Sequence, residues 1–178
     1  LYIFDPRNGE KTPFQVMNEN ITKTISKHGY SVYLYRNTSN TITILSDHVY
    51  IYDLVEKKFT IAKEETANLI NWGTLQSIGS DGTDTYLFDQ NRIYSLDQKT
   101  QSLKVIHAFV DNISINSVAF DPQGFFWIGS NLGLLRYNIK EKTISPIHTN
   151  LFADVSVVVC NQGNEIWIGA ENRLISYI

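Results

Sequence analysis

The feature that most constrains this chain is an internal repeat. The stretch FFWIGSNLGLLRYN returns forty residues later as EIWIGAENRLISYI. In both copies a tyrosine, Tyr137 or Tyr177, lies ten residues after a tryptophan, Trp127 or Trp167. A fixed period of this length indicates that one supersecondary unit is used several times along the chain.

Weaker copies of the unit extend towards the N-terminus. The closing positions of successive copies are apolar and are separated by 48, 44, 41 and 40 residues: Phe4, Tyr52, Leu96, Tyr137 and Tyr177. In the clearest copy, four short apolar runs are separated by the turn signals PQG, NLG and IKEK. Short strands at roughly ten-residue spacing indicate an antiparallel meander, and four of them in about 40–45 residues form one blade of a β-propeller.

We therefore predict an all-β chain, a single β-propeller segment of about four blades built from four-stranded antiparallel meanders. The expected units are a partial blade at 1–17, complete blades at 18–62, 63–108 and 109–149, and a partial blade at 150–178, with seventeen strands in all. The stretch 60–73 is the least strand-like and could form a helical turn or a long loop between blades.

The amino-acid composition argues against several classes of protein. The 178 residues are 43% apolar and 19% charged, which is typical of a globular domain. The net charge of −3 and the lack of a basic run argue against nucleic-acid binding. No apolar stretch approaches the roughly 20 residues of a membrane span. The single cysteine, Cys160, excludes an internal disulfide and a cysteine zinc site.

The repeated Trp-Ile-Gly triplet is best explained by packing. Alternate residues of a strand face opposite sides, so Trp127 and Gly129 share one face and Ile128 takes the other. A glycine beside a large indole leaves room for it. We assign a structural role to the recurrent positions Trp127, Gly129, Tyr137, Trp167, Gly169, Tyr177 and Tyr52. The alternative is that the two tryptophans stack on a ligand, but a binding site seldom recurs in every blade.

Other reactive side chains give no catalytic, metal or cofactor site. His107 and His148 are 41 residues apart, which is the local period, so they mark one repeated structural place. Cys160 aligns with Phe120 on a first strand and is expected to be a small buried residue. No phosphate-binding glycine loop and no hydrolase or metalloprotease motif is present.

The last third of the chain resembles the two-component regulator propeller repeat. The match in the first clear copy rests on Asp121, Gly124, Trp127, Ile128, Gly129, Gly133, Leu134, Tyr137 and Asn138. The final copy keeps Asn161, Trp167, Ile168, Gly169, Leu174 and Tyr177. The two earlier copies keep only the apolar skeleton with Asp53 or Asp97, so the resemblance is specific only in the last third.

The resemblance implies a sensory role. Proteins with this repeat are periplasmic ectodomains of hybrid two-component systems, which join propellers through a membrane helix to a histidine kinase and typically sense oligosaccharides. It implies that this chain is a segment of a larger, seven-bladed propeller, without catalytic residues or cofactors, in a dimeric, membrane-anchored parent. The exposed ends of an unclosed stack predict self-association, or pairing of the first hairpin with the last blade.

One departure from the family pattern suggests a ligand site. Where the third strand begins, the repeat expects a glycine, yet the chain has His48, Arg92 and Arg173 at three such positions. We expect them to ring one face of the propeller with Trp72 beside them, and such a ring could bind an acidic sugar through charge-assisted hydrogen bonds. The alternative is that these residues are solvated turn residues.

Two further classes remain open. Lyase propellers carry similar repeats and use a histidine base near a metal, for which His48 is the one histidine on a suitable loop. A protein-binding scaffold propeller is the other, and it would show a broad apolar patch.

Overall fold

The computed structural model describes residues 2–5, 9–13, 33–36, 40–45, 48–64, 70–81, 83–110, 112–147, 153–161 and 165–177. All regular structure in this part of the chain is β-strand. The sheets are antiparallel meanders in chain order, which confirms the predicted β-propeller segment. None of the described residues forms a helix long and apolar enough to span a bilayer.

The strands form five sheets, numbered here in chain order. Sheet 1 is the hairpin of β1 (Tyr2–Asp5) and β2 (Glu10–Pro13). Sheet 2 contains β3 (Tyr33–Arg36), β4 (Thr41–Leu45), β5 (Val49–Asp53) and β6 (Lys58–Ile61). Sheet 3 contains β8 (Gln76–Ser80), β9 (Asp84–Phe88), β10 (Arg92–Asp97) and β11 (Ser102–Ala108). Sheet 4 contains β12 (Ile115–Asp121), β13 (Phe125–Ser130), β14 (Gly133–Asn138) and β15 (Thr143–Pro146). Sheet 5 contains β16 (Val155–Cys160), β17 (Ile166–Ala170) and β18 (Arg173–Tyr177).

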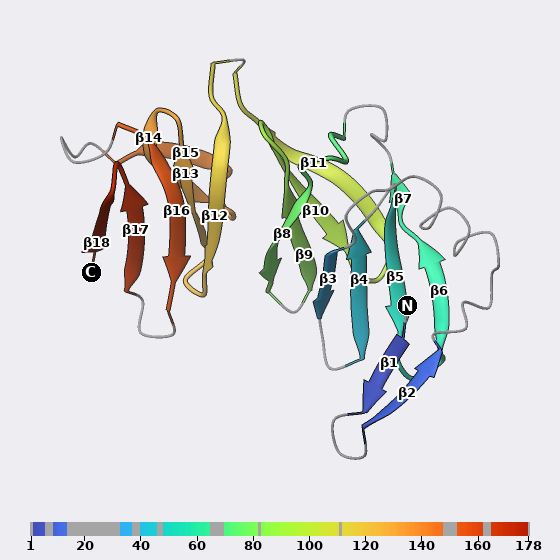
Figure 1. The fold of residues 1–178 in the computed structure, drawn as a ribbon. Helices are drawn as coiled ribbons and strands as arrows, with labels where there is room; N and C mark the ends of the chain where they lie inside the picture. The colour runs from blue at the N-terminus through green and yellow to red at the C-terminus, as the bar shows by residue number, and fades with distance from the viewer. Residues whose placement is uncertain are drawn as a thin grey trace.

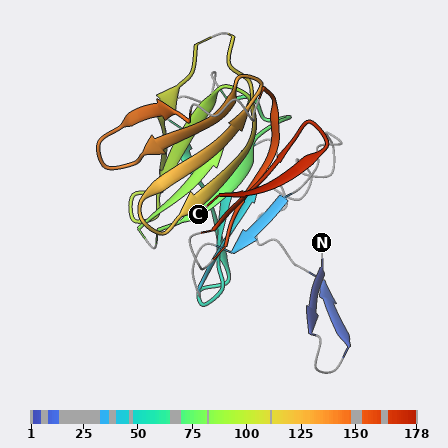
Figure 2. The ribbon, with the colours of Figure 1, turned by 90° about the vertical axis from the view of Figure 1, so that its left-hand side faces the viewer.

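Sheet 3 carries one strand that the repeat does not predict. β7 (Lys63–Glu64) pairs in parallel with the outer strand β11, and its register joins Lys63 to Ser102. This strand lies inside the stretch 60–73, whose structure the sequence left open. Among the described residues, sheet 1 forms no ladder with sheet 5, and it stands apart from the stacked sheets in Figure 2.

A repeated turn explains the polar residue that follows three of the closing positions, Tyr52, Leu96 and Tyr137. The carboxylate Oδ1 of Asp97 accepts hydrogen bonds from the backbone N–H groups of Lys99 and Thr100, at 2.8 and 3.0 Å. Asp53 and Asn138 bind the two equivalent N–H groups in their own sheets. These bonds hold the third and fourth strands in one register, because they fix a tight loop of constant length.

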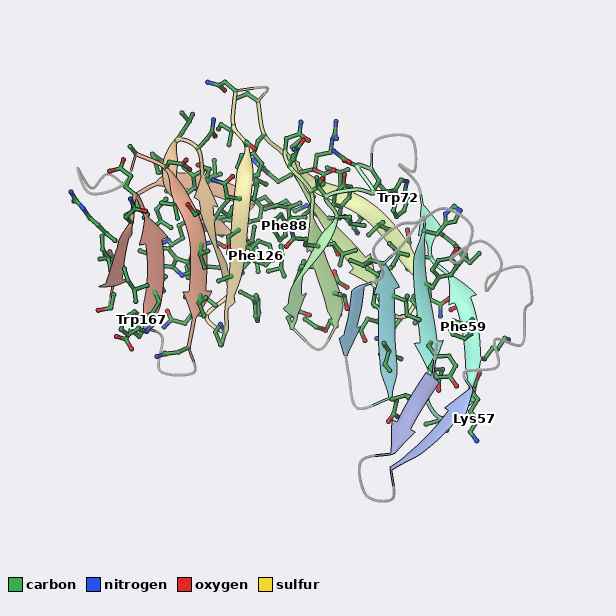
Figure 3. All side chains as sticks on the ribbon, viewed as in Figure 1. Lys57, Phe59, Trp72, Phe88, Phe126 and Trp167 are labelled. Atoms are coloured by element: carbon green, nitrogen blue, oxygen red, sulfur yellow. The ribbon has the colours of Figure 1, made fainter. Side chains whose placement is uncertain are left out.

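Sheets 2 to 5 stack face to face, as Figure 1 shows, and each junction is an apolar cluster. Because side chains alternate along a strand, one strand contributes apolar residues to both faces of its sheet. In β5, Val49 and Ile51 face sheet 3, whereas Tyr50 and Tyr52 face away from it. Between sheets 3 and 4, Phe88 and Phe126 point towards each other (Figure 3) and belong to one buried cluster. Burial of both faces of each inner strand is what drives the stack together.

Two residues of the Trp-Ile-Gly triplet of β13, Trp127 and Gly129, face sheet 5, whereas Ile128 belongs to the cluster between sheets 3 and 4. Trp127 is 4% exposed and packs in the cluster between sheets 4 and 5, and its indole Nε1 donates to Asp121 Oδ2 at 3.2 Å. A Cβ atom at Gly129 would lie 2.7 Å from Val155 Cγ1 and 2.9 Å from the Val155 carbonyl oxygen. The atoms nearest Gly129 therefore come from the next sheet, so the glycine makes room for that sheet rather than for its own tryptophan.

The outer face of sheet 5 is exposed. Leu174 is 71% exposed, Val157 and Val159 are about half exposed, and Trp167 is 37% exposed. Trp167 and Leu174 occupy the positions of Trp127 and Leu134, which are buried in sheet 4. In the described part of the chain, no strand pairs with the open edge of β18.

We predict that Gly129→Ala lowers the free energy of unfolding by about 1–3 kcal/mol, because the added methyl group overpacks a backbone contact between two sheets. Gly169→Ala is the matched control, since its new Cβ would lie 3.6 Å from Val157 Cβ and 3.9 Å from the Val157 carbonyl oxygen, which are ordinary contacts. It should change stability by less than about 0.5 kcal/mol. Urea unfolding of both variants measures the difference, and equal effects would contradict the close-approach account.

Candidate functional site

The turns that join second to third strands lie at one end of the stack, the upper end in Figure 1. We call this end the loop face. It carries His48 at the start of β5, the β9–β10, β13–β14 and β17–β18 turns, and the described parts of the connections that enter sheets 3, 4 and 5, residues 70–75, 112–114 and 153–154. Because the sheets repeat the same strand order, equivalent turns must emerge on the same side.

Asp89 is the centre of a buried hydrogen-bond network on this face. Its side chain is fully buried and its Oδ2 accepts a 2.5 Å hydrogen bond from the Tyr94 hydroxyl. The same oxygen accepts from the backbone N–H of Asn71 at 3.2 Å, while Oδ1 accepts from the N–H groups of Asn91 and Arg92. The Arg92 guanidinium lies 3.8 Å from Oδ2.

This network connects two segments that are distant in sequence. Burial, and then the bond to Asp89, raise the pKa of the Tyr94 hydroxyl far above its ordinary value, so it remains a donor. The carboxylate thereby holds the connection at Asn71 against the β9–β10 turn. Sheet 4 uses a neutral version of the same tie, in which Asn131 accepts from the Ser114 N–H at 2.8 Å and donates to the Asn112 carbonyl at 3.0 Å.

Two adjoining hollows lie across these tied loops. The larger, of about 470 Å³, is lined by Thr74, Gln76, Phe88, Asp89, Gln90, Ser114, Ile115, Asn116, Asp154 and Ser156. The smaller, of about 300 Å³, is lined by Asn71, Gln90, Asn91, Arg92, Ile113 and Ser114. They share Gln90 and Ser114, so together they form one depression, which we call the loop-face groove. Its wall consists mostly of amides and hydroxyls, which can both donate and accept hydrogen bonds.

The structure places the four predicted ligand residues in three different settings. His48 and Trp72 are brought together, with ring centroids 5.8 Å apart, and the indole packs against the cluster between sheets 2 and 3. Arg92 lines the smaller hollow. Arg173 is exposed on sheet 5, so the whole of sheet 4 separates it from Arg92. The four residues thus lie at separate places of the loop face, and their predicted role in ligand binding stays a prediction.

Sequence reasoning missed most of the groove. Asp89, Gln90 and Ser114 lie in turns or connections whose polar residues look like ordinary loop chemistry. The one available signal was Asp89, an acidic residue directly after the apolar strand TYLF. A buried carboxylate at this position needs hydrogen-bond donors close to it. The repeat pattern does not identify the residues that supply these donors.

The remaining reactive groups lie in packed surroundings. The His107 ring contacts Phe109 and Tyr137, and burial lowers its pKa, which favours the neutral imidazole. Burial raises the pKa of the Cys160 thiol, which packs beside the cluster between sheets 4 and 5. His148 lies outside the described residues. Within the described residues, no three metal-binding side chains are grouped.

We predict that Asp89→Ala lowers the free energy of unfolding by about 3–5 kcal/mol, because it leaves a tyrosine hydroxyl, three N–H groups and a cation without their buried acceptor. Asp53→Ala removes a carboxylate that caps two N–H groups at an exposed turn. That control should cost about 1 kcal/mol. Chemical unfolding of the two variants tests this, and losses of equal size would contradict a special role for Asp89.

Comparisons with known proteins show the fold. No protein-family model matches the sequence, and no curated protein matches it. The extracellular domain of BT4673, assigned as a hybrid two-component system of Bacteroides thetaiotaomicron, is similar with a TM-score of 0.69 at 18% identity, covering 99% of this chain and 24% of that one. The corresponding domain of BT3049 from the same organism has a TM-score of 0.63 at 16% identity, covering 85% and 23%.

A WD40 β-propeller domain, that of Doa1, is also similar, with a TM-score of 0.60 at 11% identity over 85% of this chain and 52% of that one. The chain spans about a quarter of the length of the two sensor domains. The predicted resemblance to ectodomains of hybrid two-component systems is thus confirmed as a likeness of fold.

Proposed function

We propose that the chain is a ligand-sensing propeller segment of a hybrid two-component sensor, placed on the extracellular or periplasmic side of the membrane and responsive to oligosaccharides. The observation that carries the proposal is the loop-face groove, a hollow of hydroxyl and amide groups on a fold shared with extracellular sensor domains. Sugars bind through many hydrogen bonds to such groups, which donate and accept in the same way as sugar hydroxyls.

The position of the groove allows ligand binding to affect how sheets 3, 4 and 5 are arranged. Residues of the connections into sheets 3, 4 and 5 line it, including Thr74, Ser114 and Asp154. A ligand that contacts all three connections binds one relative arrangement of the sheets better than another, and it shifts the equilibrium by that difference in affinity. In this proposal the segment performs no chemistry. It biases a kinase in the parent protein through a change of arrangement in a dimer.

The test is a titration of the chain with a panel of oligosaccharides, using Arg92→Ala and Arg173→Ala as a matched pair. Both residues occupy the same turn position, but only Arg92 lines the groove. We predict that Arg92→Ala weakens binding about tenfold through loss of a charged donor, while Arg173→Ala changes it less than about twofold. Equal losses in both variants would favour the predicted ring of cations, and unchanged affinity in both would contradict the proposed site.

The second candidate is a protein-binding scaffold, favoured by the exposed outer face of sheet 5. In sheet 4 the equivalent face is covered by Val155, Val158 and Ile168 of the next sheet. We propose that a second copy of the chain covers this face in solution, because the same apolar positions already form a blade-to-blade junction inside the molecule.

Self-association is tested by light scattering after size-exclusion chromatography. We predict that Leu174→Glu shifts the chain towards the monomer, since a carboxylate cannot be buried in an apolar junction without a large penalty. Leu132→Glu is the control, because Leu132 is a comparably exposed leucine, 56% exposed, in a turn of the loop face. A wild-type chain that is already monomeric, or an equal effect of both substitutions, would contradict the proposed interface.

A further inference from the structure

The charges around the loop-face groove are unequal. Among the described residues that line it, the carboxylates are Asp89 and Asp154 and the one cation is Arg92. Arg92 lies 3.8 Å from the buried Asp89, which offsets its charge. The groove as a whole therefore presents a surplus of negative charge, contributed by the solvent-exposed Asp154.

Asp154 lines the larger hollow and is held there by a neighbouring amide. Its Oδ1 accepts a 3.0 Å hydrogen bond from Asn116 Nδ2. The same amide nitrogen donates to the Val155 carbonyl, also at 3.0 Å, which anchors Asn116 between sheets 4 and 5. An acceptor fixed by one neighbour still has lone pairs for ligand hydroxyls, since a carboxylate can accept about four hydrogen bonds.

These observations oppose an anionic ligand. A ligand carboxylate in the groove would meet Asp154 without a free counter-charge, because Arg92 is already engaged by Asp89. Two like charges in one groove repel each other, and because Asp154 is exposed to solvent the repulsion is strongest at low ionic strength. Uncharged hydroxyls carry no such penalty and match the amides of Gln76, Gln90 and Asn116.

We infer that the loop-face groove takes an uncharged, polyhydroxylated ligand and rejects acidic sugars, and that Asp154 is the residue that sets this preference. The inference rests on the proposed function and refines it, because it names the class of saccharide. It replaces the acidic sugar that a ring of His48, Arg92 and Arg173 would favour.

The experiment is isothermal titration of the chain with matched saccharides: maltopentaose, cellopentaose and xylopentaose as uncharged probes, and pentagalacturonate as the anionic one. We expect an uncharged probe to bind at least about tenfold more tightly than pentagalacturonate at low ionic strength, and the ratio to shrink as salt is added. Asp154→Lys should shift the ratio towards pentagalacturonate by about tenfold or more, and Asp154→Asn by a smaller factor.

Glu141→Lys is the control, because it makes the same change in net charge in the exposed β14–β15 turn, outside the groove. It should leave the ratio unchanged. Tighter binding of pentagalacturonate by the wild-type chain, or an equal shift from the two lysine variants, overturns the inference while leaving a saccharide sensor intact. Failure of every probe to bind would overturn the proposed function, and the inference with it.

Discussion

The close approach of one sheet to the next is the interaction on which the rest of this structure depends. Gly129 lies against the Val155 carbonyl with no room for a methyl group between them. At such a distance the side chains on both sides of the junction interlock, and Trp127, Val158 and Ile168 share one buried cluster. Each sheet alone would expose two apolar faces, so a stack of sheets is the arrangement that removes both from water.

The packing also determines where polar chemistry can occur. Both faces of the inner strands are largely buried in apolar clusters, and the polar groove lies at one end of the stack. At the loop face, Asp89 accepts a hydrogen bond from Asn71 and so joins it to the β9–β10 turn, and Asn131 likewise joins the β13–β14 turn to Ser114. A groove between tied loops is largely formed before a ligand arrives, which reduces the entropy lost on binding.

The repeat predicted most of the architecture, because the period, the alternation and the turn residues are local and each is visible in the sequence. The apolar closing position and the polar residue after it, such as Leu96 and Asp97, identify the end of the third strand and the turn that follows it. The short parallel strand β7 could not be predicted, since two residues carry no pattern of their own and their pairing depends on where β11 happens to lie.

The groove was harder to predict from the sequence than the blades, because it depends on contacts between residues that are distant in sequence. Position in the repeat placed Arg92 and Arg173 in equivalent turns, but it could not show that Arg92 is committed to a buried carboxylate or that a whole sheet separates the two cations. Trp72 was expected beside these cations, but the repeat could not show that its half-buried indole packs against the cluster between sheets 2 and 3. Such outcomes depend on neighbours from other units, which a period does not encode.

The proposed ligand site of this propeller segment is the loop face. Amide hydrogen exchange with and without a saturating saccharide is the most direct test, because protection identifies the contacted backbone without any substitution. Binding at the loop face should slow exchange at residues 71–76, 89–92, 113–116 and 153–156, and leave the turns that follow Asp53, Asp97 and Asn138 unchanged. Protection of those opposite turns, with the loop-face segments unaltered, would contradict it.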